Sequence, residues 1–244
     1  MSAVGIIPAR FRASRFPGKP LAAIAGRPMI AHVIAGARRS KRLREVVVAT
    51  DDERIAAAAA AEGAPVVMTS AEHPTGTDRL AEAAADLDDA IVVNVQGDEP
   101  LIEGFVIDAL VEVLEADPEA PMATLAHALE PAALDDPNRV KLVLDRRGRA
   151  LYVSRAPIPA RREGAPAPRW LQHIGLYAYR KPFLERFPTL APGELERAEG
   201  LEQLRALEHG FAIRCAVIEG WQSHPVDVPD DVAAVEAALA RRGS

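Results

Sequence analysis

Four cations stand close together just after the first apolar segment of the chain. The stretch "IIPARFRASRFPGKPL", residues 6–21, carries Arg10, Arg12, Arg15 and Lys19. Its Pro and Gly residues shape a loop that presents backbone N–H groups, and Arg10, Arg15 and Lys19 could surround a polyanion such as a triphosphate. The spacing matches neither the P-loop nor the dinucleotide fingerprint. A loop of arginines that merely face solvent is the alternative interpretation.

An acidic cluster follows a later apolar run. The stretch "VNVQGDEP", residues 93–100, ends in Gln96, Gly97, Asp98 and Glu99. A carboxylate there can hold Mg²⁺, which commonly takes one or two protein carboxylates together with substrate phosphates. Asp98 would equally suit a turn or a helix N-cap. A cationic loop and an acidic loop that face one crevice would together favour metal-dependent phosphate chemistry.

Short β-branched runs alternate with helical patterns in the first half of the chain. The runs are residues 4–9, 45–50, 64–68 and 90–95. They are typical of strands buried on both faces, and residues 27–40 and 76–87 predict helices between them. This alternation predicts an α/β fold with a doubly wound, mostly parallel, Rossmann-like sheet. Ligands bind such sheets beyond the carboxyl ends of the strands, where these polar loops lie.

The pattern changes after residue 120. Residues 121–129, 139–145, 149–159 and 171–180 read as strands of a smaller, largely antiparallel part. Further along, the sequence predicts a helix at 193–210, a strand at 211–219 and a closing helix at 229–243. Residues 160–170 are the best candidate for a mobile loop. No long linker divides the chain, so we predict one domain over residues 1–244, with 121–180 as a mainly antiparallel subregion.

The bulk properties exclude several classes of partner. The chain has 244 residues and a formal net charge of -6, so neither nucleic acid nor a membrane is an expected partner. No apolar run approaches the roughly 20 residues that cross a bilayer. The single cysteine, Cys215, excludes an intramolecular disulfide, gives no support for zinc and fits a reducing compartment. We expect a cytoplasmic protein.

Seven fragments together resemble one enzyme family. They are "IIPARFRASRFPGKPL", "VVVATDD", "PTGTDRLAEA", "VNVQGDEP", "LYVSRAPIP", "LQHIGLYAYR" and "LEQLRAL". This set is similar to the bacterial cytidylyltransferases that activate 3-deoxy-D-manno-octulosonate (Kdo), the CMP-Kdo synthetases. The resemblance runs in order from about residue 4 to 235. It implies the nucleotidyltransferase version of the predicted sheet and the conversion of CTP and Kdo to CMP-Kdo and pyrophosphate, a step of lipopolysaccharide biosynthesis.

The resemblance also implies roles for residues at the nucleotide. Arg10, Arg15 and Lys19 would clamp the triphosphate, and Asp98 and Asp227 would hold Mg²⁺. Together these five residues form the expected catalytic set. The cytidine would be received by Ala9, Thr75, Gly76, Thr77, Arg79 and Gln96.

An acidic sugar would occupy a separate group of side chains. By the same resemblance these are Arg155, His173, Tyr177, Glu202 and Gln203. A bidentate arginine suits a carboxylate, and neutral donors and acceptors suit a polyol. His173 alone would read as a core histidine satisfied by backbone groups. The assignment of Glu202 and Gln203 rests on the resemblance, because helical periodicity neither requires nor forbids it.

The chain departs from the family pattern near Asp227. The family reads approximately G-V-D-T-P-E-D, whereas this chain has Pro225 and Val228 in place of Gly and Thr. Proline fixes φ and removes a donor, and valine lacks the hydroxyl that could cap the last helix. Two other functions stay open: a cytidylyltransferase for another acidic sugar, such as sialic acid or an amino-substituted Kdo, and a noncatalytic nucleotide-binding homologue. The family further implies a homodimer through the part after residue 120.

Overall fold

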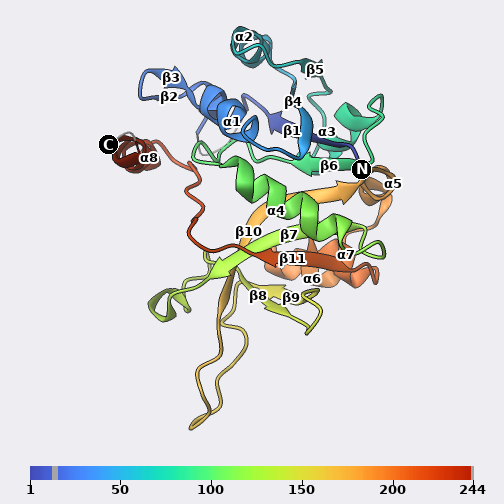
Figure 1. Ribbon diagram of the computed structural model, residues 1–244, viewed down its shortest axis with the longest axis vertical. Helices are drawn as coiled ribbons and strands as arrows, with labels where there is room; N and C mark the ends of the chain where they lie inside the picture. The colour runs from blue at the N-terminus through green and yellow to red at the C-terminus, as the bar shows by residue number, and fades with distance from the viewer. Residues whose placement is uncertain (13–15, 243–244) are drawn as a thin grey trace. The chain divides into compact units, whose positions relative to one another are not determined.

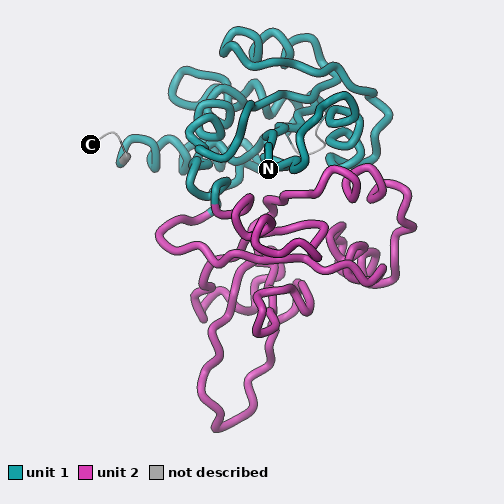
Figure 2. Tube along the Cα trace, turned by 45° about the vertical axis from the view of Figure 1, so that its right-hand side comes forward, with its two compact units in different colours: residues 1–108, 223–244 teal, residues 109–222 magenta. Residues whose placement is uncertain are grey.

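The chain forms two compact units. The computed structural model describes residues 1–12 and 16–242. Unit 1 comprises residues 1–108 and 223–244, and unit 2 comprises residues 109–222 (Figure 2). The sequence-based assignment of one domain with a subregion at 121–180 stays a prediction.

A parallel sheet with the strand order β6-β1-β4-β5 forms the centre of unit 1 (Figure 1). Its strands are β1 (Ala3–Ala9), β4 (Leu43–Thr50), β5 (Val66–Met68) and β6 (Ile91–Asn94). The register places Ile6 opposite Val47 on β4 and Asn94 on β6. Ile6, Ile7 and Val93 are fully buried, as expected for β-branched strands covered on both faces. The four strands predicted in this half of the chain are therefore confirmed.

Helices connect these strands in sequence. They are α1 (Met29–Ala37), α2 (Glu53–Ala61) and α3 (Gly76–Ala84). Apolar residues of α1 at helical spacing, including Met29, Ile30 and Val33, are fully buried. Near the C-terminus, α8 (Asp231–Arg242) returns to unit 1 and buries Val235 in a cluster with Met29.

The strand order of unit 1 creates a switch point at β1. The chain proceeds from β1 to β4 on one side, whereas β6 pairs with the other side of β1. Loops that leave β1 and β6 therefore diverge, which opens a crevice at their carboxyl ends. At this place a Cβ on Gly97 would lie 3.0 Å from the carbonyl oxygen of Pro8, so glycine lets the two loops approach closely.

Unit 2 contains a mainly antiparallel sheet. Its strands are β7 (Met122–Ala128), β8 (Lys141–Leu144), β9 (Ala150–Ser154), β10 (Leu171–Arg180) and β11 (Ile213–Val217). β10 pairs antiparallel with β7 and β8, and β8 pairs antiparallel with β9. Only the β11–β7 pair is parallel among the pairs described for this unit. The loop between β9 and β10 extends away from β8 and β9 (Figure 1).

The prediction of a single helix over residues 193–210 is wrong. The structure has two short helices there, α6 (Glu194–Glu199) and α7 (Leu204–Glu208). Gly200 adopts φ 61° and ψ 41°, a left-handed conformation that ends α6. Glu202 and Gln203 consequently lie in the turn before α7 and not on a continuous helix face.

The remaining elements are short, apart from α4, whose residues belong to both units. They are η1 (Lys19–Leu21), β2 (Ala23–Ile24), β3 (Arg27–Pro28), α4 (Gly104–Glu115), η2 (Pro131–Ala133), α5 (Lys181–Arg186) and η3 (Phe187–Thr189). Within residues 1–12 and 16–242, no helix has the length and apolar character that a membrane span requires. The predicted fold class, a mostly parallel Rossmann-like sheet with a smaller antiparallel part, is confirmed.

Candidate active site

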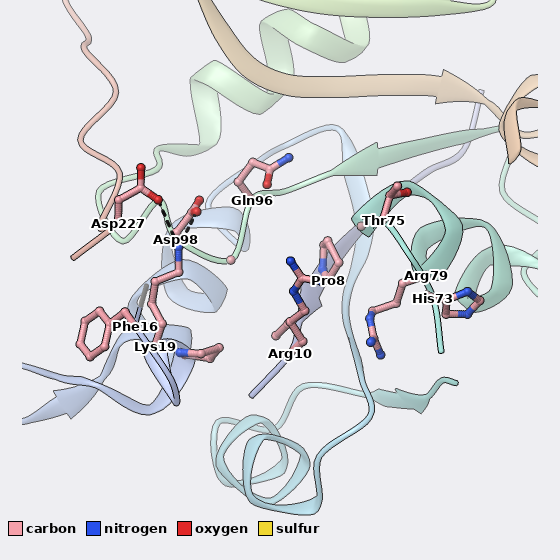
Figure 3. Close-up of a pocket in the computed structure, with 14 residues that line it drawn as sticks. Pro8, Arg10, Phe16, Lys19, His73, Thr75, Arg79, Gln96, Asp98 and Asp227 are labelled. Carbon is pink, nitrogen blue, oxygen red and sulfur yellow. Dashed lines mark hydrogen bonds and ion pairs between the residues drawn. The ribbon is translucent and has the colours of Figure 1, made fainter. Parts of the chain in front are cut away.

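Loops at the carboxyl ends of β1 and β6 line a pocket in unit 1 (Figure 3). Its lining residues are Pro8, Ala9, Arg10, Phe16, Lys19, Pro20, His73, Thr75, Gly76, Arg79, Gln96, Gly97, Asp98 and Asp227. Lys19, Asp98 and Asp227 gather at one end of the pocket, and Thr75, Arg79 and His73 gather at the other (Figure 3).

An ion-paired cluster forms the first end of the pocket. Lys19 Nζ lies 2.8 Å from Asp98 Oδ2 and 3.7 Å from Asp227 Oδ1. The Lys19 side chain is only 16% exposed, whereas that of Asp227 is 44% exposed. The two carboxylates come from parts of the chain far apart in sequence, and one ammonium group offsets the charge of both.

The loop after β1 positions Lys19 by a tight turn. Gly18, at φ 74°, precedes η1 and donates its N–H to the Phe11 carbonyl oxygen at 2.9 Å. A Cβ at Gly18 would lie 3.0 Å from the Phe11 ring, so glycine is required by both the backbone and the space. The Arg54 Cζ lies 3.5 Å from the centroid of that ring, and Arg54 also binds the Asp52 carboxylate. Helix α2 thereby anchors the base of the cationic loop.

Backbone hydrogen bonds bring Asp227 to Asp98. The N–H of Val226 donates to the carbonyl oxygen of Asp98 at 2.9 Å. Asp231 Oδ2 accepts from the N–H groups of Asp227 and Val228 at 2.7 and 2.9 Å. Asp231, which the family pattern also contains, thus holds the amides that precede α8 although Val228 has no hydroxyl.

Glu99 holds the segment that leads to Asp227 by separate hydrogen bonds. Its carboxylate accepts hydrogen bonds from Ser223 Oγ and from the N–H of His224, the latter at 3.1 Å. Burial raises the pKa of Glu99 to about 7, and the negative charge of Asp98 adds to the rise. The hydrogen bond from Ser223 opposes it by stabilising the carboxylate. Sequence reasoning gave Glu99 no role, although it stands within the quoted acidic stretch.

The N-terminus of α3 forms the second end of the pocket. Thr75 is its N-cap: Thr75 Oγ1 accepts from the Asp78 N–H at 3.2 Å, and Asp78 Oδ2 accepts from the Thr75 N–H at 3.1 Å. Arg79, one turn further on, is 3% exposed. Its guanidinium contacts Asp51 Oδ1 at 3.1 Å and donates to Thr69 Oγ1. These partners hold the arginine in place at the pocket wall.

Most residues predicted for the nucleotide line this pocket. They are Ala9, Arg10, Lys19, Thr75, Gly76, Arg79, Gln96, Asp98 and Asp227. Thr77 is buried in α3 and is not among the lining residues described, and Arg15 lies outside the described residues. Sequence reasoning missed Phe16, which lies inside the quoted motif at residues 6–21, and His73, which directly precedes another quoted motif. Their roles, like those of the predicted residues, stay predictions.

The residues predicted for the sugar lie in unit 2. His173 and Tyr177 both belong to β10, and their ring centroids are 5.6 Å apart. His173 is 9% exposed, and its Nε2 lies 2.9 Å from Thr124 Oγ1. Burial lowers the pKa of His173 to about 4, so the ring is neutral near pH 7. Burial also raises the pKa of Tyr177 well above its usual value, and Tyr179 and Glu202 add to the rise.

The other three sugar candidates lie on turns of unit 2. Glu202 is close enough to Tyr177 to influence its titration. Gln203 is 5% exposed, and its Nε2 has no hydrogen-bond partner among the described residues. Arg155, just after β9, donates Nε–H to the Glu199 carbonyl oxygen at 2.7 Å. A buried amide without a partner is costly, which favours Gln203 as a ligand contact.

Asp98 and Asp227 are the two carboxylates among the lining residues described for the pocket. Within the described part of the chain, no group of three or more His, Cys, Asp or Glu side chains could hold a metal ion. Asp98 and Asp227 nevertheless converge on one cation, the Lys19 ammonium. Two carboxylates together with ligand phosphates suffice for Mg²⁺.

The fold and the pocket define a class of protein. A doubly wound parallel sheet, with a helix N-terminus, cations and paired carboxylates at its switch point, is an α/β protein built for a phosphorylated ligand. A family model described as "Cytidylyltransferase" matches residues 4–214. The chain therefore belongs to the cytidylyltransferase family, and the family resemblance found in the sequence is confirmed.

Individual relatives are similar over nearly the whole chain. The 3-deoxy-manno-octulosonate cytidylyltransferase of Syntrophobacter fumaroxidans is 55% identical, over 99% of this chain and 98% of its own length. The protein of the same name from Bdellovibrio bacteriovorus is 47% identical over 100% of both chains. A solved structure of CMP:2-keto-3-deoxy-manno-octonic acid synthetase complexed with CTP has a TM-score of 0.94 and 42% identity, covering 99% of this chain and 100% of that one.

The buried His173 predicts a loss of stability in acid. Its pKa is about 4 when folded, and about 6.5 is usual for an unfolded chain. The unfolded state therefore binds more protons between these values, and stability falls as the pH drops from about 6.5 toward 4. The contribution of His173 at pH 5 is a loss of about 1 to 2 kcal/mol relative to pH 7.

Urea unfolding at pH 7 and pH 5 measures this loss. The variant His173→Gln has no titrating ring and should show a smaller difference between the two pH values than the wild type. An identical difference in both proteins would mean that His173 is not buried in its neutral form.

Proposed function

We propose that this chain transfers CMP from CTP to the anomeric hydroxyl of Kdo and releases pyrophosphate. The observation that carries the proposal is the pocket of unit 1, which joins a cation–carboxylate cluster to a helix N-terminus. Relatives that carry the corresponding name match at 47 to 55% identity over nearly the full length. The similar structure complexed with CTP supports a nucleotide in this pocket.

The cationic loop would bind the triphosphate. Arg10 is exposed and lines the pocket, and Lys19 Nζ stands at its carboxylate end. Transfer of CMP builds negative charge on the departing pyrophosphate, so fixed cations lower the barrier if they are in position before reaction. Arg10 and Lys19, with Arg15 from the same sequence motif, are proposed for this task.

The far end of the pocket would receive the cytidine. The positive end of the α3 dipole and the hydroxyl of Thr75 lie there, where they can attract polar groups of a ligand. Arg79, held by Asp51 and Thr69, offers a fixed cation edge, and the amide of Gln96 lies between the two ends of the pocket. A polar, pre-formed wall of this kind suits recognition of one base among several.

Asp98 and Asp227 would hold Mg²⁺. The position of Lys19 supports this assignment, because its ammonium group lies within 4 Å of both carboxylates and shows that they can share one cation. When bound, Mg²⁺ supplies charge that stabilises phosphate oxygens and favours deprotonation of the attacking hydroxyl. The chain's own contribution is to keep both carboxylates at this place through Glu99 and Asp231. No side-chain general base is needed in this account.

Unit 2 would bind the acidic sugar. Arg155 suits the carboxylate of Kdo, and the neutral His173, the protonated Tyr177 and the amide of Gln203 suit its hydroxyls. For transfer, the 2-hydroxyl of the sugar must attack the α-phosphorus of CTP in line, so alignment is the main task of these contacts. We also propose a homodimer, a cytoplasmic location and a role in lipopolysaccharide biosynthesis.

Pyrophosphate release tests the proposed reaction. Purified protein should release pyrophosphate only when CTP, Kdo and Mg²⁺ are all present, because each supplies a separate part of the transfer. UTP, ATP and GTP in place of CTP, and EDTA in place of Mg²⁺, are the controls.

The sugar panel decides between the open alternatives. Turnover with sialic acid or an amino-substituted Kdo, but not with Kdo, would replace the proposed acceptor. CTP binding without pyrophosphate release for any sugar acid would indicate a noncatalytic nucleotide-binding protein.

Replacing Asp98 tests its role at the metal. Asp98→Asn keeps the side-chain size but removes the negative charge, so kcat should fall by about 100-fold or more. The Mg²⁺ concentration for half-maximal rate should also rise. Circular dichroism should stay unchanged.

Asp86→Asn is the matched control, because Asp86 is exposed and outside the pocket. It should behave as the wild type. A folded Asp98→Asn variant with near-normal turnover would exclude Asp98 as a metal ligand.

A further inference from the structure

A buried lysine ties the backbone of Arg155 to the loop before β8. Lys141 is fully buried. Its Nζ donates to the carbonyl oxygen of Arg155 at 2.5 Å and to that of Asp136 at 2.9 Å. Burial of an ammonium group is costly and lowers the pKa of Lys141, so an apolar residue would fill this space more cheaply. The presence of a lysine at this buried position therefore indicates that its side chain serves to hold these two carbonyl groups.

A glutamate ties the other side of the same residue. Glu199, the last residue of α6, accepts from the backbone N–H of Arg155 at 2.9 Å through Oε2. Its Oε1 accepts from Ser154 Oγ at 2.6 Å. Burial alone would raise the pKa of Glu199, but the hydrogen bonds from Ser154 and Arg155 together hold it below its usual value. Glu199 therefore stays a carboxylate with both oxygens engaged.

Two of the three guanidinium nitrogens of Arg155 are held by backbone carbonyl groups. Nε donates to the carbonyl oxygen of Glu199 at 2.7 Å, and Nη1 donates to that of Pro137 at 3.1 Å. Among the described residues, Nη2 has no hydrogen-bond partner. The side chain thus has a fixed direction and donors left over, and its conformational entropy is lost before any ligand arrives.

We propose that Lys141 and Glu199 are positioning residues that fix Arg155 to receive the carboxylate of the sugar acid. The inference rests on the proposed function, because it assigns to these two residues the orientation of a sugar contact. Lys141 holds the carbonyl of Arg155, the Glu199 carboxylate holds its N–H, and the Glu199 main-chain carbonyl holds its Nε. The N–H groups left on Nη1 and Nη2 form the end-on fork that can hold a carboxylate. Loss of either side chain frees the backbone of Arg155, shifts the fork and weakens sugar binding without affecting CTP.

The test is steady-state pyrophosphate release by wild type, Glu199→Gln and Lys141→Met, with CTP and Mg²⁺ saturating and Kdo varied. In Glu199→Gln one acceptor oxygen becomes an NH₂ group, so Ser154 and Arg155 can no longer both donate to this side chain. In both variants we expect the KM for Kdo to rise roughly 10- to 100-fold, whereas the KM for CTP should stay within about twofold of the wild-type value.

Glu208→Gln is the matched control. The Glu208 carboxylate also accepts two backbone N–H groups in unit 2, those of Leu195 and Glu196, but it makes no contact with Arg155. Its KM for Kdo should equal that of the wild type. A rise as large as that of Glu199→Gln would assign the effect to general loosening of α6 and would overturn the proposal.

A double-mutant cycle separates positioning from a structural role. In the Arg155→Ala background, Glu199→Gln should raise the KM for Kdo no further, because the group that it positions is absent. Additive effects, or equal rises in the KM for Kdo and for CTP, would overturn the proposal. Glu199→Gln carries the test alone if Lys141→Met does not fold.

Turnover of Kdo by the wild type separates the proposed function from the positioning role of Lys141 and Glu199. A wild type that fails to turn over Kdo would overturn the proposed function together with this inference. Wild-type turnover with an unchanged KM for Kdo in Glu199→Gln would overturn the inference alone.

Discussion

The contact of one ammonium group with two carboxylates is the constraint on which the pocket of unit 1 depends. Asp98 and Asp227 both lie within 4 Å of the Lys19 ammonium group. The two carboxylates would repel each other, and the cation offsets that repulsion. Three chain segments must meet for the contact to form: the loop after β1, the loop after β6 and the stretch before α8. Each segment has its own fastening. Gly18 permits the turn that carries Lys19, and Asp231 caps the amides at Asp227.

The same principle governs both units, because charged side chains are oriented by groups that do not face a ligand. In unit 1, Arg79 is held by Asp51 and Thr69 at the α3 end of the pocket. In unit 2, Lys141 and Glu199 hold Arg155 by its backbone and its Nε. A flexible cation that is ordered in advance loses less entropy on binding and keeps its charge where it is needed in the transition state. Much of the site therefore depends on residues that hold other side chains in place.

The sequence predicted the parallel strands and the polar loops at their ends because buried β-branched runs and charged turns leave local patterns. It failed where local pattern and backbone conformation conflict. The apolar spacing across 193–210 suggested one helix, but the left-handed conformation of Gly200 divides it. The sequence also could not reveal that Glu99 and Asp231 hold the segment before α8 in place. Their partners are backbone N–H groups and a serine hydroxyl, which leave no pattern in the sequence.

Titration of CTP into the purified protein without Kdo, by isothermal calorimetry, tests most directly whether the pocket of unit 1 is a metal-assisted CTP site. The titration is made at matched ionic strength with Mg²⁺ or with EDTA, and with ATP in place of CTP. CTP should bind in the presence of Mg²⁺, and the affinity should fall by about tenfold or more with EDTA in place of Mg²⁺ or with ATP in place of CTP. Equal affinity with and without Mg²⁺, or equal affinity for ATP and CTP, would contradict this expectation.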